Sequence, residues 1–343
     1  MNRIKYLTVL MLLCLLAACA PAGNGIQTAT VGTLTAVPGS TSTQILPGST
    51  TASPSLTNTQ PPEVFTAIAN LTPTVTPAAS LKVYFVDVGQ GDSILILSPD
   101  GKIVLIDGGE ADSGCLPFLK SLGITHIDLM VATHPHSDHI GGLVQVLTAM
   151  PVARVVTNGQ ISPTASFEHF LDGIANEKAV LIIAKQGDTI SEGQLSFTVL
   201  SPVNTSGDDL NHNSLVLRLV YGQVSFLFMG DADQAAEAGM IAAGLAVPTT
   251  ILKVGHHGSE YSSSPAFLAL VRPAVAIYTA GTGNDYGFPK PVTLANLAAV
   301  GAQIYGTDVN GTISVTTDGQ IYRVDIEKGT TRMPVLLLPS VTP

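Results

Sequence analysis

Three short apolar runs in this chain are each followed at once by side chains that bind metal ions. The runs are 129–132, followed by a histidine-rich stretch at 133–142, then 225–229, followed by Gly230 and Asp231, and 251–254, followed by Gly255, His256 and His257. Short apolar runs bounded by turn residues are typical of strands, and a strand end that turns through glycine presents side chains from a rigid scaffold to a common point. The pattern therefore predicts a layered α/β domain with a metal site where these strands end.

The histidine-rich stretch alone supplies ligands for two neighbouring metal positions. His134, His136, Asp138 and His139 lie within six residues. Imidazole nitrogen and carboxylate oxygen suit zinc, manganese or iron, and a mixed set is typical of a catalytic rather than a closed structural site. His134 and His136 are two apart in extended chain and so leave on the same side, whereas Asp138 and His139 lie where the chain turns into the next helix.

The first residues predict export and membrane attachment. A basic start, an apolar run too short to span a bilayer and small residues before Cys19 indicate a signal peptide over 1–18. The run Leu-Ala-Ala-Cys over 16–19 resembles a bacterial lipobox, which implies cleavage before Cys19 and a lipid on its sulfur. An ordinary signal peptide with an incidental cysteine is the alternative. We expect an exported cell-envelope lipoprotein that faces away from the cytoplasm.

Composition divides the rest of the chain. Residues 19–80 are mainly Thr, Ser, Pro, Gly and Ala, which cannot bury enough surface to offset their ordering entropy, so we expect a disordered tether. One folded domain is expected over 81–328, followed by a flexible tail over 329–343. Within the domain we expect strands over 81–88, 94–98, 103–106, 129–132, 154–157, 180–184, 195–200, 215–220, 224–229, 251–254 and 274–278, and helices over 116–122, 142–150, 167–176, 234–243, 265–270 and 293–300.

Charge and cysteine content limit the candidate functions. The formal net charge is −10, and no cluster of Lys and Arg follows the signal peptide, which disfavours tight, non-specific binding of nucleic acid. Phosphodiester cleavage remains open, because a metal supplies local positive charge. Cys115 is the only thiol left after export and lipidation, so we expect no internal disulfide and a buried or incidental thiol.

The order of the motifs then resembles a known family. HPHSDHIGG at 134–142, FMGD at 228–231 and LKVGHHGS at 252–259 are accompanied by VDVGQGDS at 86–93, IDGG at 106–109, NHNSLVL at 211–217 and NDYGFP at 284–289. Together they resemble the metallo-β-lactamase superfamily, and most closely its ComEC-like branch, the hydrolase domain of competence DNA-uptake proteins, here as a free-standing secreted lipoprotein. The resemblance covers about 81–325 and implies an αββα sandwich with the metal site at one edge of the two sheets.

The resemblance also implies roles for individual residues. His134 and His136 would bind a first metal, Asp138 and His139 a second, and Asp231 would bridge the two. His257 would complete the second site, with His256 as its competitor for that role. The catalytic residues expected on this basis are Asp138, Asp231 and His256, and the residues expected to orient ligands or face the substrate are Asp107, Asp87, Asn213, Ser259 and Tyr286.

Two positions depart from the wider family. Many members have a third histidine for the first metal near 211–214, whereas the ComEC-like branch and this chain have Asn and Ser there. His212 is the alternative source of that imidazole, but if 215–219 is a strand, His212 takes the face opposite to Asn211 and Asn213. The first metal is then held by fewer protein groups. The second departure is Phe288, where relatives often have histidine, because phenylalanine can neither give a proton nor bind a phosphate.

These features predict a metal-dependent hydrolase that uses one or two Zn²⁺ ions, with Mn²⁺ as the alternative. A phosphodiesterase or nuclease that uses metal-bound hydroxide is the leading hypothesis, since such an ion lowers the pKa of water from 15.7 to about 7. Its partners would be a phosphoester substrate, with extracellular DNA favoured by the resemblance, and a membrane through lipid on Cys19. The alternatives are a hydrolase of a small or wall-associated phosphoester, lactone or amide, and a non-catalytic metal-binding surface protein.

Overall fold

The computed structural model describes residues 80–329 except 206 and 208. The signal peptide, the lipid site at Cys19, the tether up to residue 79 and the tail from residue 330 lie outside the described residues. None of the helices in the described part of the chain has the length and apolar run that crossing a bilayer requires.

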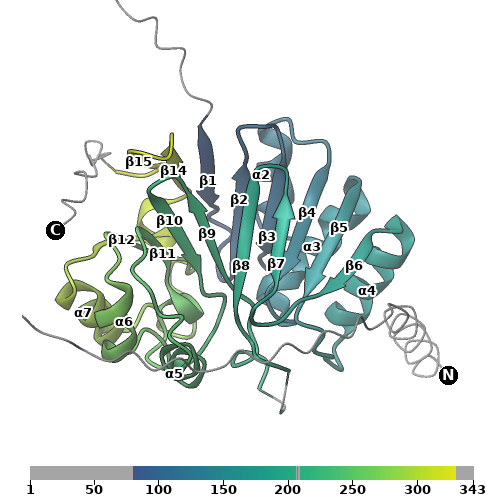
Figure 1. The fold of residues 1–343 in the computed structure, drawn as a ribbon. Helices are drawn as coiled ribbons and strands as arrows, with labels where there is room; N and C mark the ends of the chain where they lie inside the picture. Colours follow the sequence, from purple (N-terminus) through teal and green to yellow (C-terminus); the bar gives the residue numbers. More distant parts are fainter. Residues whose placement is uncertain (1–79, 206, 208, 330–343) are drawn as a thin grey trace, which may run out of the picture. The chain divides into compact units, whose positions relative to one another are not determined.

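Two mixed β-sheets face each other, and helices cover their outer faces (Figure 1). The first sheet has the strand order β15 (Tyr322–Ile326), β14 (Ile313–Thr317), β1 (Leu81–Phe85), β2 (Ser93–Leu97), β3 (Ile103–Gly108), β4 (Ile127–Ala132), β5 (Val152–Thr157) and β6 (Val180–Ile183). The second has the order β13 (Gln303–Gly306), β12 (Val275–Tyr278), β11 (Ile251–Lys253), β10 (Val224–Phe228), β9 (Val216–Tyr221), β8 (Leu195–Ser201) and β7 (Thr189–Glu192).

Three apolar clusters hold these layers together. One lies between the sheets and includes Phe85, Phe226 and Phe228. The second packs the first sheet against α2 (Cys115–Ser121), α3 (Ser137–Ala149) and α4 (Ala165–Glu177). The third packs the second sheet against α5 (Gln234–Ala242), α6 (Pro265–Val271) and α7 (Pro291–Ala299). The αββα sandwich expected from the sequence is thereby confirmed.

The alternation of side chains along the strands explains the layers. In β1 every second residue is buried between the sheets, and Tyr84 between them packs edge-on against Phe118 of α2. In β10 all five residues are buried, because Phe226 and Phe228 face the other sheet while Leu227 faces the helices. A strand buried on both faces reads as a continuous apolar run.

Parallel pairing places the functional loops at the ends of neighbouring strands. β3 to β6 are parallel to one another in the first sheet, and β10 to β13 are parallel in the second. The ends of parallel strands meet at one edge of a sheet. The first turns of α3 pack closely against the end of β3, because a Cβ on Gly142 would lie 1.9 Å from the carbonyl oxygen of Gly108.

The observed elements differ from the sequence expectations in a few places. α3 begins at Ser137 rather than at residue 142, so Asp138 and His139 lie in its first turn and not in a preceding loop. β1 ends at Phe85, before the expected end at residue 88. The sequence reading missed β7, β13, β14, β15 and the short helix α8 (Thr307–Asn310). Of these, β7 and β15 pair antiparallel with β8 and β14, which are next to them in the chain, whereas β14 also pairs antiparallel with β1, which lies far away in the sequence.

Candidate metal centre

Four predicted ligands converge at the strand ends. Asp138, His139, Asp231 and His257 each offer one ligand atom, and these atoms all lie within 4.8 Å of one another. His257 Nε2 lies 3.2 Å from Asp138 Oδ2 and 3.3 Å from Asp231 Oδ2, while His139 Nε2 lies 3.3 Å from Asp231 Oδ1. This is the second-metal set that the resemblance implies, and it contains His257 rather than His256.

The buried polar atoms of this set fit a divalent cation. His139 Nε2, His257 Nε2 and Asp231 Oδ1 are buried and have no hydrogen-bond partner within the described residues. A buried polar atom without a partner is costly, and such atoms are normally paired with protein, water or an ion. Two imidazole nitrogens and two carboxylates are a donor set that suits zinc or manganese.

Asp107 holds the first loop and His139 in place from behind. Its carboxylate accepts hydrogen bonds from the backbone nitrogen and the hydroxyl of Thr133, at 2.8 and 2.7 Å, and from His139 Nδ1 at 2.8 Å. Since a carboxylate only accepts, Nδ1 of His139 carries a proton, and this hydrogen bond directs Nε2 of the ring into the cluster. Asp107 is at the end of β3 with φ of 56°, which turns its side chain toward this loop.

His257 is oriented in the same way by groups of both sheets. Its Nδ1 donates to the carbonyl oxygen of Thr279 at 2.9 Å and lies 3.3 Å from Asp92 Oδ1. Asp92 also accepts a short hydrogen bond from the Thr279 hydroxyl and forms an ion pair of 2.7 Å with Lys253 Nζ. Asp92 and Lys253 are fully buried.

Sequence reasoning missed this buried pair. Asp92 was noted only within the motif at 86–93 and Lys253 only within the motif at 252–259, although a lysine within the apolar run 251–254 is itself a signal. A charged side chain in a strand that is otherwise apolar must be paired when it is buried.

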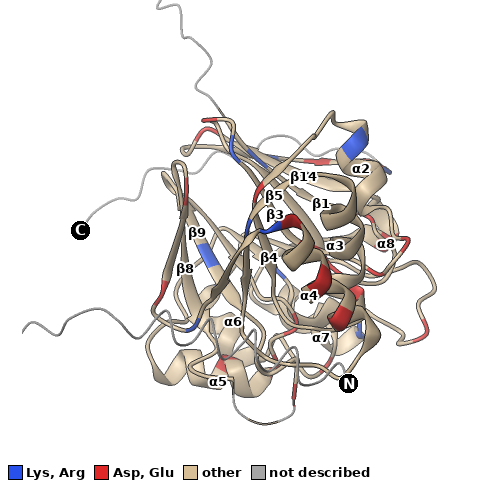
Figure 2. Cartoon of the chain, turned by 90° about the vertical axis from the view of Figure 1, so that its right-hand side faces the viewer, with Lys and Arg blue, Asp and Glu red and all other residues tan. Residues whose placement is uncertain are grey.

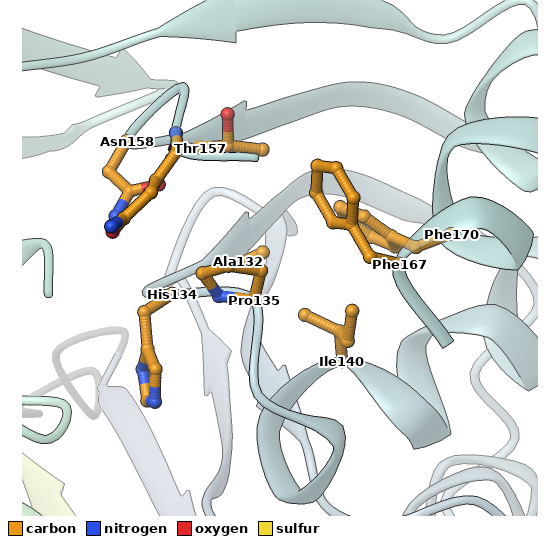
Figure 3. A pocket seen from close by; sticks show the side chains of 9 residues that line it. Ala132, His134, Pro135, Ile140, Thr157, Asn158, Phe167 and Phe170 are labelled. Atoms are coloured by element: carbon orange, nitrogen blue, oxygen red, sulfur yellow. Dashed lines mark hydrogen bonds between the residues drawn. The ribbon is translucent and has the colours of Figure 1, made fainter. Parts of the chain in front are cut away.

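The first-metal residues form a looser group. His134 Nε2 and His136 Nδ1 are 2.9 Å apart, and His134 Nε2 lies 3.9 Å from Asp231 Oδ2. Behind His134 is a cavity of about 10 Å³ with mostly apolar walls, and Figure 3 shows the imidazole pointing away from Phe167 and Phe170. Burial, together with the nearby charge of His139, lowers the pKa of His134 well below its usual value, so this ring is neutral and offers a lone pair.

His256 lies beside the cluster and lines an open pocket. Its Nε2 is 3.8 Å from Asp231 Oδ2 and 3.4 Å from the side-chain nitrogen of Asn211. The pocket has a volume of about 320 Å³, and Asp209, Asn211 and Tyr261 are among its lining residues. Burial lowers the pKa of His256, so it is uncharged at neutral pH.

His212 does not join the ligands. It is part-exposed, and its Nδ1 lies 2.9 Å from Asp233 Oδ1, at the N-terminus of α5. Residues 210–213 form a turn before β9, so the strand alternation from which the sequence placed His212 does not apply there.

Electrostatics within the cluster favour a cation. Burial lowers the pKa of His139, but the carboxylates of Asp231, Asp138 and Asp107 outweigh burial and raise the pKa well above its usual value. His257 behaves in the same way, with Asp231 as the largest opposing charge. Burial raises the pKa of Asp231, yet the two histidines hold it well below its usual value. Protons on the imidazoles therefore neutralise carboxylates that a metal ion would otherwise neutralise.

The remaining candidates from the sequence lie in supporting positions. Asp87 pairs with Lys328 at 3.1 Å and accepts a hydrogen bond from Gly89, with no contact to the cluster among its described interactions. Asn213 is buried and donates to the carbonyl oxygen of Asp209. The hydroxyl of Ser259 accepts from the backbone nitrogen of Tyr261 within its own turn. Tyr286 stacks on Phe288, whose ring adjoins both histidines of the last motif.

Comparison with known proteins identifies the family. A metallo-β-lactamase superfamily model matches residues 86–281. ComE operon protein 3 of Bacillus subtilis (strain 168) is 30% identical over 251 residues, 68% of this chain and 32% of that protein. Competence protein ComA of Neisseria gonorrhoeae is 28% identical over 244 residues, 70% of this chain and 33% of that protein. Recombination protein 2 of Haemophilus influenzae is 30% identical over 236 residues, 67% of this chain and 28% of that protein.

The chain therefore spans about a third of the length of these curated relatives. The matches confirm the ComEC-like resemblance, and the family model covers more than half of the sequence. The chain belongs to the metallo-β-lactamase superfamily.

Proposed function

We propose that this metal-dependent hydrolase of the metallo-β-lactamase superfamily cleaves phosphodiesters. The observation that carries the proposal is the convergence of three buried ligand atoms without a hydrogen-bond partner among the described residues, on His139, His257 and Asp231, beside an open pocket. A divalent ion held by these groups would polarise a phosphoryl oxygen and lower the pKa of water to about 7. The ComEC-like relatives favour a phosphodiester over other esters.

The protein groups have distinct tasks in this proposal. Asp231 lies between the two ligand groups, with Oδ1 facing His139 and Oδ2 facing His257 and, at longer range, His134. It can therefore serve both metal positions. His256, neutral and 3.8 Å from Asp231, is free of the four-residue set and can bind an ion or accept a proton at the pocket side.

The acidic surface directs the choice of substrate. Lys and Arg are scattered over the described elements, and Figure 2 shows no basic stripe in its view. Binding of a long polyanion along its backbone would therefore be weak. Short or single-stranded phosphodiesters, recognised close to the metal centre, are the substrates that this surface accommodates best.

An assay with three substrates tests the proposal. Bis-nitrophenyl phosphate, single-stranded DNA and a lactone are offered to the zinc- or manganese-loaded protein, and we expect hydrolysis of the two phosphodiesters. Asp231→Ala and His134→Ala should reduce turnover to the level of the protein-free blank while circular dichroism stays unchanged. Asp325→Asn, which removes a surface carboxylate paired with Arg323, should have wild-type activity.

Other results would favour the alternatives. Turnover of the lactone alone would indicate ester or amide chemistry. Less than one bound transition metal per chain, with no turnover after reconstitution, would indicate a non-catalytic surface protein, a reading motivated by Phe288 in place of the histidine of many relatives. Turnover by metal-free Asp231→Ala would exclude the mechanism.

We also propose that the protein acts outside the cytoplasm on a lipid anchor. The support is the N-terminal sequence alone, with its short apolar run and Cys19 at the end of a lipobox-like motif. Fatty-acid labelling of the expressed full chain should mark the wild type and not Cys19→Ser. Labelling of both would contradict the assignment of Cys19.

A further inference from the structure

The rings of Phe288 and Tyr286, called the aromatic ladder below, extend outward from His256 and His257 at the metal centre. The ring of Phe288 lies 5.5 Å from that of His256 and 6.3 Å from that of His257, measured between centroids. Tyr286 stacks on Phe288 with centroids 5.5 Å apart and an interplanar angle of 11°. Tyr286 is 61% exposed, so the ladder ends at the surface.

The loop that carries the ladder is held in one conformation. The side chain of Asn284 accepts a hydrogen bond from the Phe288 nitrogen at 3.0 Å and donates to the carbonyl oxygens of Phe288 and Gly281, at 2.7 and 2.9 Å. The backbone nitrogen of Lys290 donates to the carbonyl oxygen of Gly258 at 2.9 Å, which ties this loop to the turn that carries the two histidines. The rings are therefore positioned relative to the metal ligands before a substrate binds.

We propose that Tyr286 and Phe288 form a stacking subsite for a nucleobase beside the scissile phosphodiester, and that the substrate is single-stranded nucleic acid. This inference rests on the proposed phosphodiesterase function. An exposed aromatic ring binds any base through its flat face, independently of sequence. In a duplex the faces of each base are covered by its neighbours, so an unpaired base is needed.

The charge around the ladder agrees with a nucleotide. The Lys290 ammonium lies 5.5 Å from the centre of the Phe288 ring and donates to the carbonyl oxygen of Tyr286 at 2.8 Å. Its ion pair with Glu260 is long, at 3.9 Å, which leaves it able to approach a phosphate of the bound strand. Because the chain carries few other basic residues, ring stacking must supply much of the affinity.

Fluorescence in the absence of metal tests the subsite without relying on activity. The chain contains no tryptophan, so Tyr286→Trp places a single indole at the outer end of the ladder. In chelator-treated protein, a thymidine oligonucleotide should quench this emission in a saturable way, and an abasic strand of equal length should not. Leu122→Trp, 39% exposed at the end of α2, is the control and should respond to neither strand.

Kinetics of the metal-loaded enzyme provide the second test. Tyr286→Leu should raise the KM for a single-stranded oligonucleotide about tenfold, within the range that stacking contributes per base, and change kcat little. Tyr286→Phe keeps the ring and should retain the wild-type KM. The abasic strand should give the same KM with all three proteins.

Equal KM values for Tyr286→Leu and wild type on the base-bearing strand would overturn the subsite, as would equal quenching by the two strands. Turnover of bis-nitrophenyl phosphate in the same preparation separates this failure from failure of the proposed function. If no phosphodiester is cleaved, the function is wrong, and the metal-free titration still decides whether the rings bind a base.

Discussion

Three residues at the metal centre, Asp107, His256 and His257, have left-handed backbone conformations, with φ of 56°, 46° and 54°. For residues other than glycine this conformation costs roughly 1–2 kcal/mol each. It persists only where surrounding contacts determine it. Here those contacts include the Thr133 hydrogen bonds to Asp107 and the Thr279 carbonyl oxygen that accepts from His257. Backbone strain is therefore concentrated where side chains must converge.

Metal binding should release protons. The raised pKa values of His139 and His257 keep both imidazoles protonated at neutral pH in the metal-free protein, whereas a metal ligand must be neutral. Affinity for zinc should therefore rise with pH through pH 7. Calorimetric titration in buffers of different ionisation enthalpy measures the protons released per ion, and a value of zero at pH 7 would contradict the charge distribution described above.

The thiol of Cys115 should be unreactive in the folded protein. Burial raises its pKa to about 11, and the side chain packs with Leu119 and Leu143 in the cluster under α2 and α3. At pH 8 only about one thiol in a thousand is then ionised. A maleimide or iodoacetamide reagent should leave Cys115 unlabelled until denaturant is added, as judged by peptide mass spectrometry. Rapid labelling of the native protein at this position would show that the thiol is accessible.

At the scale of elements, a buried ion pair connects the two sheets directly behind the metal centre. Asp92 immediately precedes β2 of the first sheet, and Lys253 is the last residue of β11 in the second. Lys253 also donates to the carbonyl oxygen of Val254 at 2.8 Å. The backbone nitrogen of Asp92 donates to the carbonyl oxygen of Asp138 in the first turn of α3, and the Asp92 carboxylate lies 3.3 Å from His257 Nδ1. The pair thus positions the segments that carry Asp138 and His257.

Removing one member of this pair should destabilise the protein strongly. Lys253→Met leaves the Asp92 carboxylate buried without its cation, and breaking a buried pair in this way costs about 3–5 kcal/mol. The double variant Lys253→Met with Asp92→Asn should recover part of the loss, because no buried charge then remains. Urea unfolding of both single variants and the double variant measures the coupling. Additive free energies of unfolding would show that the two residues do not interact.

At the scale of the whole molecule, metal binding and folding are coupled. Two of the four ligands lie in the first turn of α3, and the other two follow β10 and β11, so the site exists only in the folded chain. A ligand that binds only the folded state at a hundred times its Kd stabilises it by about 2.7 kcal/mol. The metal also takes over from the imidazole protons the neutralisation of the buried carboxylates.

Chelation should therefore lower the Tm. For a domain of this size 1 kcal/mol corresponds to roughly 2–4 °C, so removal of a tightly bound ion should lower the Tm by several degrees. Asp231→Asn, which weakens the site, should show a much smaller difference between the metal-loaded and chelated forms. Identical melting curves for wild-type protein with and without chelator would argue against a tightly held ion.

The strands with strong apolar runs and the amphipathic helices were predictable, because the spacing of apolar residues that marks them can be read from a few neighbouring positions. The start of α3 was not: glycines 141 and 142 resemble a turn in sequence, but in the fold they allow the helix to approach the end of β3. β14 was missed because it pairs with β1, which lies far away in the chain, and β15 joins the sheet only through its hairpin with β14. Such polar, alternating strands acquire their structure from the sheet.

The candidate ligands were equally readable from the sequence, since imidazole and carboxylate at strand ends have few other uses. Sequence alone determined the fold family, the ligand types and the loops that carry them. Only the tertiary structure placed His257 rather than His256 in the four-residue set, directed His212 to Asp233, and revealed Asp92 and Lys253 as a pair. Adjacent histidines have the same chemistry. Which of them becomes the ligand depends on the backbone angles of the turn and on the Thr279 carbonyl oxygen of another segment, and no local sequence pattern contains either.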